Sequence, residues 1–388
     1  MKTVLITNGQ LRKSLCAARS LGEKGIRVIV SEETRMNPTA FSRYCSAFVR
    51  SPNAKKEPER YLEWLKRTTA DYQCDAVFPM DDDTMDIAVA HADELSSCFA
   101  LPVPGKESYK KARDKRFSVQ LAERSGVPCP RTVLPKEGAS LPETVAALGY
   151  PLVIKPAESS GSRGIRIVCT LEELQENMKT IAEAYGHLLL QEYIPQGDRY
   201  DVCMLVGRDG EVKASFVQKE LRHFPLKTGP STVQQSVTYP ELEAYALRML
   251  AALPWFGIIE FEFMVDPRDG VPKFMEINPR FWCSLHTAVA AGVDFPFLLW
   301  ELACGNKVTP VRSYLEGVTG SWILPGDTLH FLFNKNRFRM DPPFLAGKRH
   351  GVSDDILSRR DPLPALGFVL ACFRYLFSAE AWQFMFRR

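Results

Sequence analysis

Two neighbouring stretches of the chain decide its fold: residues 260–266, EFEFMVD, and residues 274–280, FMEINPR. Each stretch alternates polar with apolar side chains, which is the pattern of a β-strand with one apolar face. An Asp-Gly turn signal at residues 269–270 lies between them. The two stretches are therefore predicted to pair as an antiparallel hairpin.

This hairpin would gather oxygen ligands. Glu262 faces the same side as Glu260, and Glu276 and Asn278 share one face of the returning strand. Carboxylate and amide oxygens, together with phosphate oxygens of a nucleotide, are the ligands that Mg²⁺ takes, and Mn²⁺ accepts the same set. The alternative is a surface hairpin with exposed acids, but a glutamate among phenylalanines is costly without a cation. We expect Glu262, Glu276 and Asn278 to bind the metal.

Two cationic side chains accompany the hairpin in the sequence. Arg280 follows it directly and offers a planar fork for a phosphate or a carboxylate. Lys155 ends the apolar strand 152–154 and precedes the Gly/Ser loop 158–164, ESSGSRG, and a second strand, 165–168. Backbone NH groups of such a loop can close over phosphates, and a lysine at its root supplies a point charge. The alternative is an ordinary hairpin with a Gly/Ser loop.

A third feature is residues 191–194, QEYI, at the end of an apolar strand. The backbone of such a strand end could face an adenine edge, and Asp198 or Asp201 could then hydrogen-bond ribose hydroxyls. An ordinary strand and turn is the alternative.

The N-terminal part alternates strands and helices. Strand 3–7, helix 11–23 and strand 27–30 follow each other closely, and a further strand, 76–80, precedes an acidic stretch. This spacing implies right-handed crossovers and a parallel sheet. The first strand continues into TNGQ at residues 7–10 and not into Gly-x-Gly-x-x-Gly, so a dinucleotide-binding oxidoreductase is disfavoured.

The middle of the chain predicts a different architecture. A helix is expected over 110–124, another over 171–185, and a strand over 188–191. Further strands, which alternate or run apolar and are separated by Asp-Gly turns, indicate an antiparallel sheet: 201–206, 212–218, 258–265 and 273–277.

Taken in this order, these features resemble the ATP-grasp superfamily, and especially its carbamoyl-phosphate-synthase-like carboxylate-amine ligases. The resemblance covers roughly residues 1–305. It implies an α/β and α+β fold with an N-terminal parallel α/β (pre-ATP-grasp) domain, a small lid subdomain and an antiparallel-sheet catalytic subdomain. The expected divisions are a pre-ATP-grasp domain at 1–107, an ATP-grasp domain at 108–309 with its lid at about 127–190, and a C-terminal extension at 310–388.

The resemblance also implies roles for single residues. Lys115 and Lys155 correspond to the two nucleotide lysines, Glu192 is expected to accept from the adenine amino group, and Ile194 to donate through its backbone. Arg280 and Lys155 are the expected catalytic residues, contacting the transferred phosphate. The nucleotide-binding set as a whole is Lys115, Lys155, Glu158, Ser160, Gly161, Ser162, Gly164, Glu192, Tyr193, Ile194, and Asp198 or Asp201.

The activity implied by the resemblance is ATP- and Mg²⁺-dependent ligation. A small carboxylate is phosphorylated to an acyl phosphate and then coupled to an amine, with release of ADP and phosphate. One alternative is phosphorylation of bicarbonate, as in carboxylases and carbamoyl-phosphate-type enzymes. Another is a catalytically silent ATP-binding module, which would have no physical need for the full set of magnesium and phosphate ligands.

The sequence says less about the residues that would bind the carboxylate and the amine. Arg222, His223 and Lys227 lie in a cation-rich segment that would suit a carboxylate substrate, although charged loops are usually just solvated. Trp282 and Ser284, which follow Arg280, could line the same pocket or belong to the core.

Composition narrows the classes of function. The chain has 388 residues, with 49 basic and 46 acidic side chains and a net charge of +3, which argues against a general nucleic-acid coat. The ten cysteines show neither a Cys-x-x-Cys pair nor ligand spacing, and the N-terminal apolar run is too short for a signal peptide. We expect a cytoplasmic protein, and the family resemblance suggests a homodimer.

The C-terminal part contains one apolar run, residues 365–373, which is far shorter than the ~20 residues of a membrane span. An aromatic and basic tail, residues 382–388, follows it. Docking on a partner, docking on a membrane surface and packing against the body of the protein are the alternatives, and we expect packing against the body.

Overall fold

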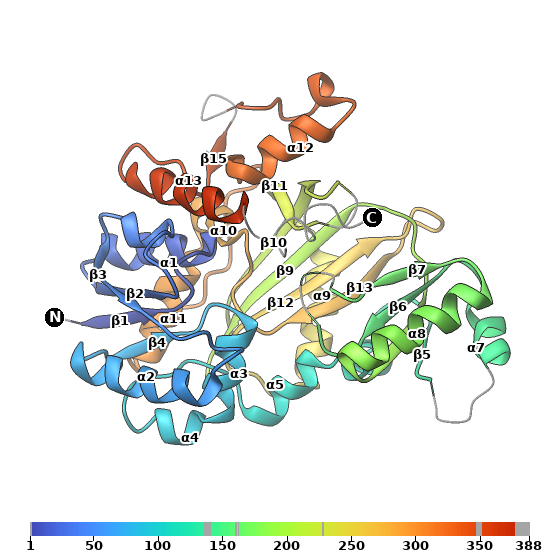
Figure 1. Cartoon of the computed structure of the whole chain (residues 1–388), viewed down its shortest axis with the longest axis horizontal. Helices are drawn as coiled ribbons and strands as arrows, with labels where there is room; N and C mark the ends of the chain where they lie inside the picture. Colours follow the sequence, from blue (N-terminus) through green and yellow to red (C-terminus); the bar gives the residue numbers. More distant parts are fainter. Residues whose placement is uncertain are drawn as a thin grey trace.

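The computed structural model describes residues 2–135, 141–159, 161, 163–226, 229–346 and 351–376. Three sheets organise these residues, with helices between and around them (Figure 1). Within the described ranges, no helix is both long enough and apolar enough to cross a bilayer.

The N-terminal sheet is parallel, with strand order β3-β2-β1-β4, as the sequence predicted. One face packs on α1 and the other on α2 and α3. The elements of this part are β1 (Thr3–Ile6), α1 (Arg12–Glu23), β2 (Arg27–Glu32), η1 (Thr39–Phe41), β3 (Cys45–Arg50), α2 (Pro58–Asp71), β4 (Ala76–Phe78), α3 (Asp82–Ala90) and α4 (Ala92–Leu95).

The single helix expected over 110–124 is wrong. The structure has two helices, α5 (Lys106–Arg113) and α6 (Lys115–Arg124), separated at Asp114. Asp114 has an extended backbone, and its side chain accepts from the backbone N–H of Arg116, so it caps α6. The break lets the backbone N–H of Lys115 donate to the carbonyl of Ala157, at 2.9 Å. A helical periodicity that continues across a cap residue cannot reveal such a break.

The second sheet forms a small lid, with strand order β5-β8-β6-β7. The predicted hairpin is confirmed, because β6 and β7 pair antiparallel. Helix α8 covers one face of this sheet, and Leu174 and Ile181 of that helix are buried there. The elements are β5 (Thr132–Val133), α7 (Leu141–Leu148), β6 (Leu152–Pro156), β7 (Arg166–Val168), α8 (Leu171–Tyr185) and β8 (Leu188–Glu192).

The third sheet has seven strands in the order β13-β12-β9-β10-β11-β14-β15 and is antiparallel except for the last pair. Helices α6 and α9 cover one face, while α10, α11 and the N-terminal helix α1 cover part of the other. Its elements and helices are β9 (Arg199–Val206), β10 (Val212–His223), β11 (Ser231–Ser236), α9 (Pro240–Ala251), β12 (Gly257–Val265), β13 (Pro272–Asn278), α10 (Leu285–Ala290) and α11 (Phe295–Ala303).

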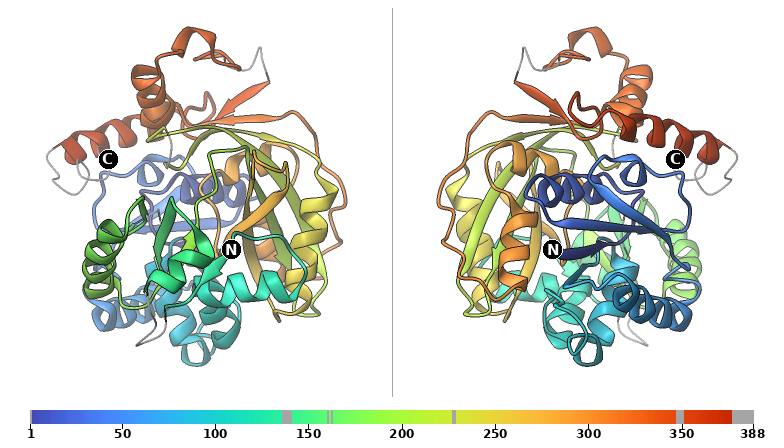
Figure 2. Two further views of the ribbon diagram at one scale, coloured as in Figure 1. Left: turned by 90° about the vertical axis from the view of Figure 1, so that its right-hand side faces the viewer. Right: turned by 90° about the vertical axis from the view of Figure 1, so that its left-hand side faces the viewer.

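The chain after residue 310 returns to the seven-stranded sheet and to the N-terminal part. Strands β14 and β15 extend the seven-stranded sheet, and α13 packs beside η1 of the N-terminal part through Gly367 and Phe41. These elements lie together at one end of the molecule in Figure 1 and in both views of Figure 2. They are β14 (Thr319–Ser321), η2 (Ile323–Asp327), α12 (Thr328–Phe333), η3 (Arg337–Arg339), β15 (Val352–Asp354) and α13 (Leu363–Leu376).

Packing of the apolar run 365–373 against the body is thereby confirmed, because Phe368 is buried in a cluster with Leu15 and Ile356. The tail at 382–388 lies outside the described residues.

Buried ion pairs hold this C-terminal part in place. Arg12 of α1 contacts Asp355 at 2.6 Å, with both side chains buried, and its guanidinium also donates to the carbonyl of Ser231. Arg19 of the same helix contacts Asp361 at 2.9 Å. One N-terminal helix therefore anchors the C-terminal part through two charges that are withdrawn from water.

Replacing Arg12 by methionine should lower the free energy of unfolding by about 3 kcal/mol, because Asp355 is left buried without its counter-charge. Urea unfolding measures the change. The double variant Arg12→Met/Asp355→Leu should recover part of the loss. The matched control is Arg60→Met, which breaks an exposed pair with Glu57 and should cost less than about 1 kcal/mol. Equal losses in the two single variants would contradict the anchoring role.

Candidate functional site

One face of the seven-stranded sheet changes character along its strands. Near Ile258, Cys203 and Phe216 it is apolar and lies in the core shared with α1, α10 and α11. Two to four residues further along the same strands, the side chains become acidic. The opposite face, with Phe261 and Phe263, stays apolar and packs on α9. Alternation thus places the acidic side chains on one open floor, at the edge of the shared core.

The strand register aligns these side chains in rows. Glu262 lies directly opposite Glu276 in the β12–β13 pair, and Glu260 lies opposite Asn278. On the other side of β12, Glu262 lies opposite Asp201 of β9, which in turn lies opposite Gln218 of β10. Asn278 Nδ2 donates to Glu262 Oε1 at 2.6 Å. The predicted hairpin is confirmed, and it brings Glu262, Glu276 and Asn278 together; their role as metal ligands stays a prediction.

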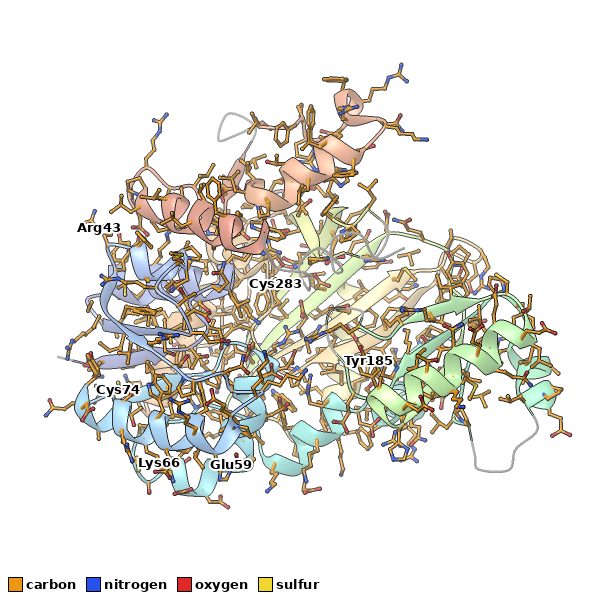
Figure 3. The ribbon with its side chains drawn as sticks, viewed as in Figure 1. Arg43, Glu59, Lys66, Cys74, Tyr185 and Cys283 are labelled. Atoms are coloured by element: carbon orange, nitrogen blue, oxygen red, sulfur yellow. The ribbon has the colours of Figure 1, made fainter. Side chains whose placement is uncertain are left out.

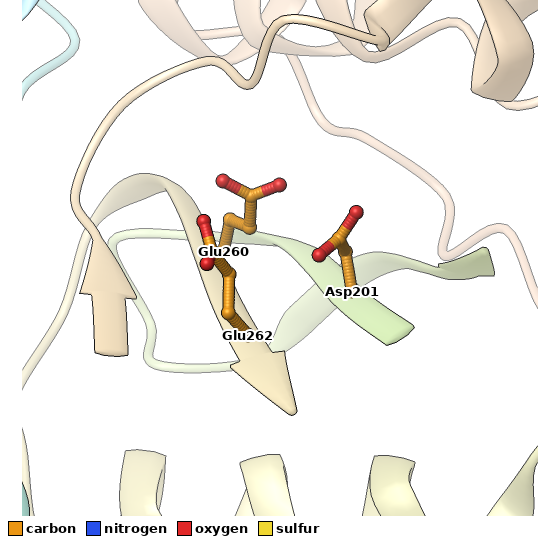
Figure 4. Close-up of side chains that lie close together, drawn as sticks. All are labelled: Asp201, Glu260 and Glu262. Atoms are coloured by element: carbon orange, nitrogen blue, oxygen red, sulfur yellow. The ribbon is translucent and has the colours of Figure 1, made fainter. Parts of the chain in front are cut away.

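Two further carboxylates join this group. One oxygen each of Asp201, Glu260 and Glu262 lies within 4.8 Å of the others, and all three side chains rise from the same side of the sheet (Figure 4). Asp201 accepts from Gln218 Nε2 at 2.6 Å. Asp201 thus belongs to the acidic floor, and its role as one of the two candidate ribose ligands stays a prediction. Period-two spacing from Glu262 pointed to Glu260, but the cross-strand neighbour Asp201 had no sequence signal.

Burial and mutual repulsion raise the pKa values of this group. Burial raises the pKa of Glu260 to about 7, and burial together with Glu220 and Glu260 holds the pKa of Asp201 well above its usual range. Burial and Glu276 do the same to the pKa of Glu262. The raised pKa values mean that the positive charge near these three carboxylates does not offset their burial and mutual repulsion. This donor set therefore fits a divalent cation, which would stabilise their ionised forms.

Lysines from two other parts of the fold face this floor. Lys115 Nζ at the start of α6 contacts Glu276 Oε2 at 3.0 Å and donates to the carbonyl of Ser159 at 2.7 Å. Lys155 in β6 is 8% exposed, and burial lowers its pKa to about 8, although Glu276 and Glu262 counteract this. Burial opposes ionisation of Glu276 as well, but the two lysines outweigh it and its pKa is lowered. Lys115 thus contacts the hairpin directly, and Lys155 lies close enough for Glu276 and Glu262 to influence its pKa.

Arg280 connects the hairpin to the N-terminal sheet. Its Nε donates to Asp82 Oδ1 at 3.0 Å and one terminal nitrogen donates to Asn278 Oδ1 at 3.1 Å. Asp82 also contacts Arg113 at 2.9 Å, and despite burial these two guanidinium groups hold the pKa of Asp82 well below its usual range. Lys13 Nζ donates to the carbonyl of Phe281 at 2.6 Å. Sequence reasoning missed Asp82, Arg113 and Lys13, because their partners lie far away along the chain.

The predicted hinge lies at the end of β8, where the lid begins to approach β13. Glu192 already has partners: its backbone N–H donates to the carbonyl of Arg131, and its carboxylate accepts from Arg131 Nε at 3.0 Å. Ile194 is buried and Tyr193 half-buried. Asp198 is exposed and accepts from Lys219 Nζ at 2.6 Å. The adenine and ribose roles of these residues stay predictions.

Part of the predicted phosphate loop, residues 158–164, lies within the described residues. Glu158 and Gly161 are exposed, and Gly164 is buried with a φ of 76°, a conformation that favours glycine. Ser160 and Ser162 lie outside the described residues.

Arg222, one of the predicted substrate residues, has a buried partner in the structure, and its substrate role stays a prediction. Its guanidinium is buried and forms a two-pronged pair with Asp327, at 2.8 and 2.9 Å, so it anchors η2. His223 Nε2 lies 2.7 Å from Glu220 Oε2. Lys227 lies outside the described residues. Trp282 is a core residue, packed edge-on against Phe295.

An open groove of about 970 Å³ lies elsewhere, along β3 and α2, and is lined by residues such as Arg50, Trp64 and Arg67. None of the site residues named above lines it. The groove with the larger volume is therefore not the candidate site, which is marked instead by the carboxylates and cationic side chains gathered at the hairpin.

Comparison with known sequences agrees with this geometry. Residues 114–310, just over half of the chain, match the family described as "Carbamoyl-phosphate synthase L chain, ATP binding domain". The large chain of carbamoyl phosphate synthase from Thermotoga neapolitana is 28% identical over 223 residues, which are 55% of this chain and 20% of that protein. The counterpart from Clostridium acetobutylicum is 25% identical over 221 residues, with 54% and 20% covered. The chain thus spans about a fifth of the length of these relatives.

Solved structures share the fold. Biotin carboxylase from Campylobacter jejuni aligns with a TM-score of 0.69 and 19% identity, covering 82% of this chain and 74% of that one. N5-carboxyaminoimidazole synthetase from Staphylococcus aureus, complexed with ADP, aligns with a TM-score of 0.63 and 17% identity, covering 82% and 80%. From the matched residues and the shared fold, the chain belongs to the carbamoyl-phosphate synthase L chain ATP-binding family of the ATP-grasp superfamily.

Proposed function

We propose that this protein is an ATP- and Mg²⁺-dependent ligase that phosphorylates a small carboxylate and couples it to an amine. The observation that supports the proposal best is the pairing of Glu262 with Glu276 beside Asn278, faced by Lys115 and Lys155. Acceptors for a cation and donors for phosphate oxygens lie next to each other. Phosphoryl transfer requires this combination.

Magnesium would be held by Glu262, Glu276 and Asn278, with Mn²⁺ as a substitute. Bound there, it would neutralise charge on the phosphate oxygens of ATP. The excess of buried carboxylates supports this assignment, because the group is unfavourably charged without a cation.

The remaining charges would act on the transferred phosphoryl group. Lys155 is a buried point charge at the root of the loop, and its low exposure strengthens its field. Arg280 is oriented by Asp82, so its fork is preorganised for an acyl phosphate or a carboxylate. Closure of the loop 158–164 would keep water away from the intermediate.

The proposed reaction has two displacements. A carboxylate oxygen of the substrate attacks the γ-phosphorus of ATP, the bond to ADP breaks, and an acyl phosphate forms. The amine then attacks the acyl carbon, phosphate leaves with the bonding electron pair, and the amine nitrogen loses a proton to form an amide. No nucleophile from the protein is needed.

Bicarbonate is the second candidate for the phosphorylated acid. The sequence relatives named above are carbamoyl phosphate synthase large chains. For location and assembly we propose a cytoplasmic homodimer. A biotin carboxylase domain of the same fold, from Hydrogenobacter thermophilus, is described as a dimer.

Lys155→Met should weaken ATP binding about tenfold, because a charge-assisted contact to phosphate is worth ~1.5 kcal/mol. Titration calorimetry with ATP and magnesium measures this. Lys66→Met, on the N-terminal helix α2, removes a lysine outside the site and should bind ATP as the wild type does. An unchanged affinity of Lys155→Met would count against the phosphate contact.

Glu276→Ala should reduce turnover of ATP by roughly a hundredfold or more, the loss typical of removing one electrostatic group from an active site. Its thermal unfolding should stay close to that of the wild type, because Glu276 lies on an open floor and not in the core. Glu183→Ala, an exposed glutamate of α8, is the control. Retained turnover in Glu276→Ala would disprove the metal assignment.

The proposal as a whole is tested by measuring ADP and phosphate release with amino acids and small carboxylates, offered singly and in pairs, and with bicarbonate. Release that requires an organic acid, rises with an amine and gives a condensed product supports the ligase. Release with bicarbonate alone would favour the second candidate. ATP binding without release for any pair would favour a silent nucleotide-binding module.

A further inference from the structure

Exposed large hydrophobic side chains gather in the C-terminal part of the chain. Among the described residues there are fifteen, and ten of them lie between residues 315 and 373. Eight of these ten form what we call the C-terminal surface: Leu332, Phe333, Phe338 and Leu345 around α12 and η3, and Leu363, Leu366, Val369 and Phe373 on α13. Scattered apolar side chains on a surface need no explanation, but a concentration of this kind does.

Helix α13 has two apolar faces. One packs against the body, with Phe368 and Ala371 buried beside Trp322 and Leu15. The other carries the four exposed residues at 363, 366, 369 and 373, a spacing that places them on one side of a helix. Packing within the fold therefore accounts for only one of the two faces.

Phe338 gives the clearest case around α12. It is 87% exposed, whereas its neighbour Phe331 is half-buried and stacks on Phe344 at 4.5 Å. Its ring meets that of Phe331 edge-on at 5.7 Å, but this contact leaves most of the Phe338 ring open to solvent. In Figure 1 and both views of Figure 2, α12 projects at the same end of the molecule that carries α13.

Positive charge accompanies both sets of apolar side chains. Lys335, Arg337 and Arg339 lie in and beside η3. Arg359 and Arg360 are exposed just before α13, and Arg43 donates to the carbonyl of Arg360; Figure 3 shows Arg43 beside this helix.

Negative charge is scarce on the same surface. Among the described residues from 328 to 376, the acidic ones are Asp341, Asp354, Asp355 and Asp361. Asp355 and Asp361 are buried in pairs with arginines of α1, and Asp354 accepts from backbone N–H groups. Only Asp341 in this range is exposed, so the charge presented outward is positive.

We propose that the C-terminal surface docks on a membrane of anionic lipids. Apolar side chains on projecting helices, rimmed by lysine and arginine, are the arrangement that inserts into the interface of a bilayer while the cations contact lipid phosphates. The proposed attachment is peripheral, in keeping with the described residues, none of whose helices is long and apolar enough to cross a bilayer.

The test uses the full chain with sedimented vesicles of phosphatidylcholine, either pure or mixed with phosphatidylglycerol. The wild type should bind the anionic vesicles and bind the neutral ones much more weakly. Phe338→Asp/Phe373→Asp should bind at least about tenfold more weakly, because two inserting side chains are lost. Phe338→Trp should keep binding. Arg337→Gln/Arg339→Gln should weaken it and reduce its dependence on salt.

The control is Leu247→Asp, an exposed leucine on α9 away from the C-terminal surface, which should bind vesicles as the wild type does. Unchanged ATP binding verifies that each variant is folded. The proposal is overturned if the wild type stays in solution with anionic vesicles, or if the double phenylalanine variant binds as well as the control. It is equally overturned if light scattering shows a dimer that only the phenylalanine variant dissociates, since the surface would then belong to a second copy of the chain.

Discussion

The structure of the candidate site depends on like charges placed opposite each other. Glu262 lies opposite both Glu276 and Asp201, and Glu260 lies within the same cluster. In water these carboxylates would separate, but the register of three strands prevents it. The sheet stays intact because its other face is an apolar core built around Phe261, Phe263 and Phe274. Core packing thus holds the acids together, and the acids in turn require cations.

Those cations come from three separate segments of the chain. Lys115 arrives through the break between α5 and α6, Lys155 from the lid, and Arg280 from the loop that the N-terminal sheet contacts through Asp82. Each connection crosses a boundary between sheets. The site therefore lies where the three sheets meet. A shift of one sheet would move its cationic side chain relative to the carboxylates of the acidic floor.

The C-terminal part contributes in another way. Its buried aspartates pair with Arg12, Arg19 and Arg222, so it ties α1 to the edge of the seven-stranded sheet. Removing such charges from water costs free energy, and the pairs are specific because each carboxylate has its own guanidinium. The same elements present apolar and basic side chains outward, which separates the anchoring face of this part from its proposed docking face.

The sequence by itself determined the helices and strands, and those parts of the site that lie close together along the chain. Period-two alternation predicted the β12–β13 hairpin and placed Glu262, Glu276 and Asn278 on it, and the alternation of strands and helices predicted the parallel sheet. Tertiary structure alone decided which side chains from distant parts of the chain became partners. It placed Asp201 on the acidic floor, paired Arg222 with Asp327, and added Asp82, Arg113 and Lys13 around Arg280. Periodicity reports which face of its own strand a side chain occupies, but its partners across the sheet depend on register and on packing between sheets, which no local pattern encodes.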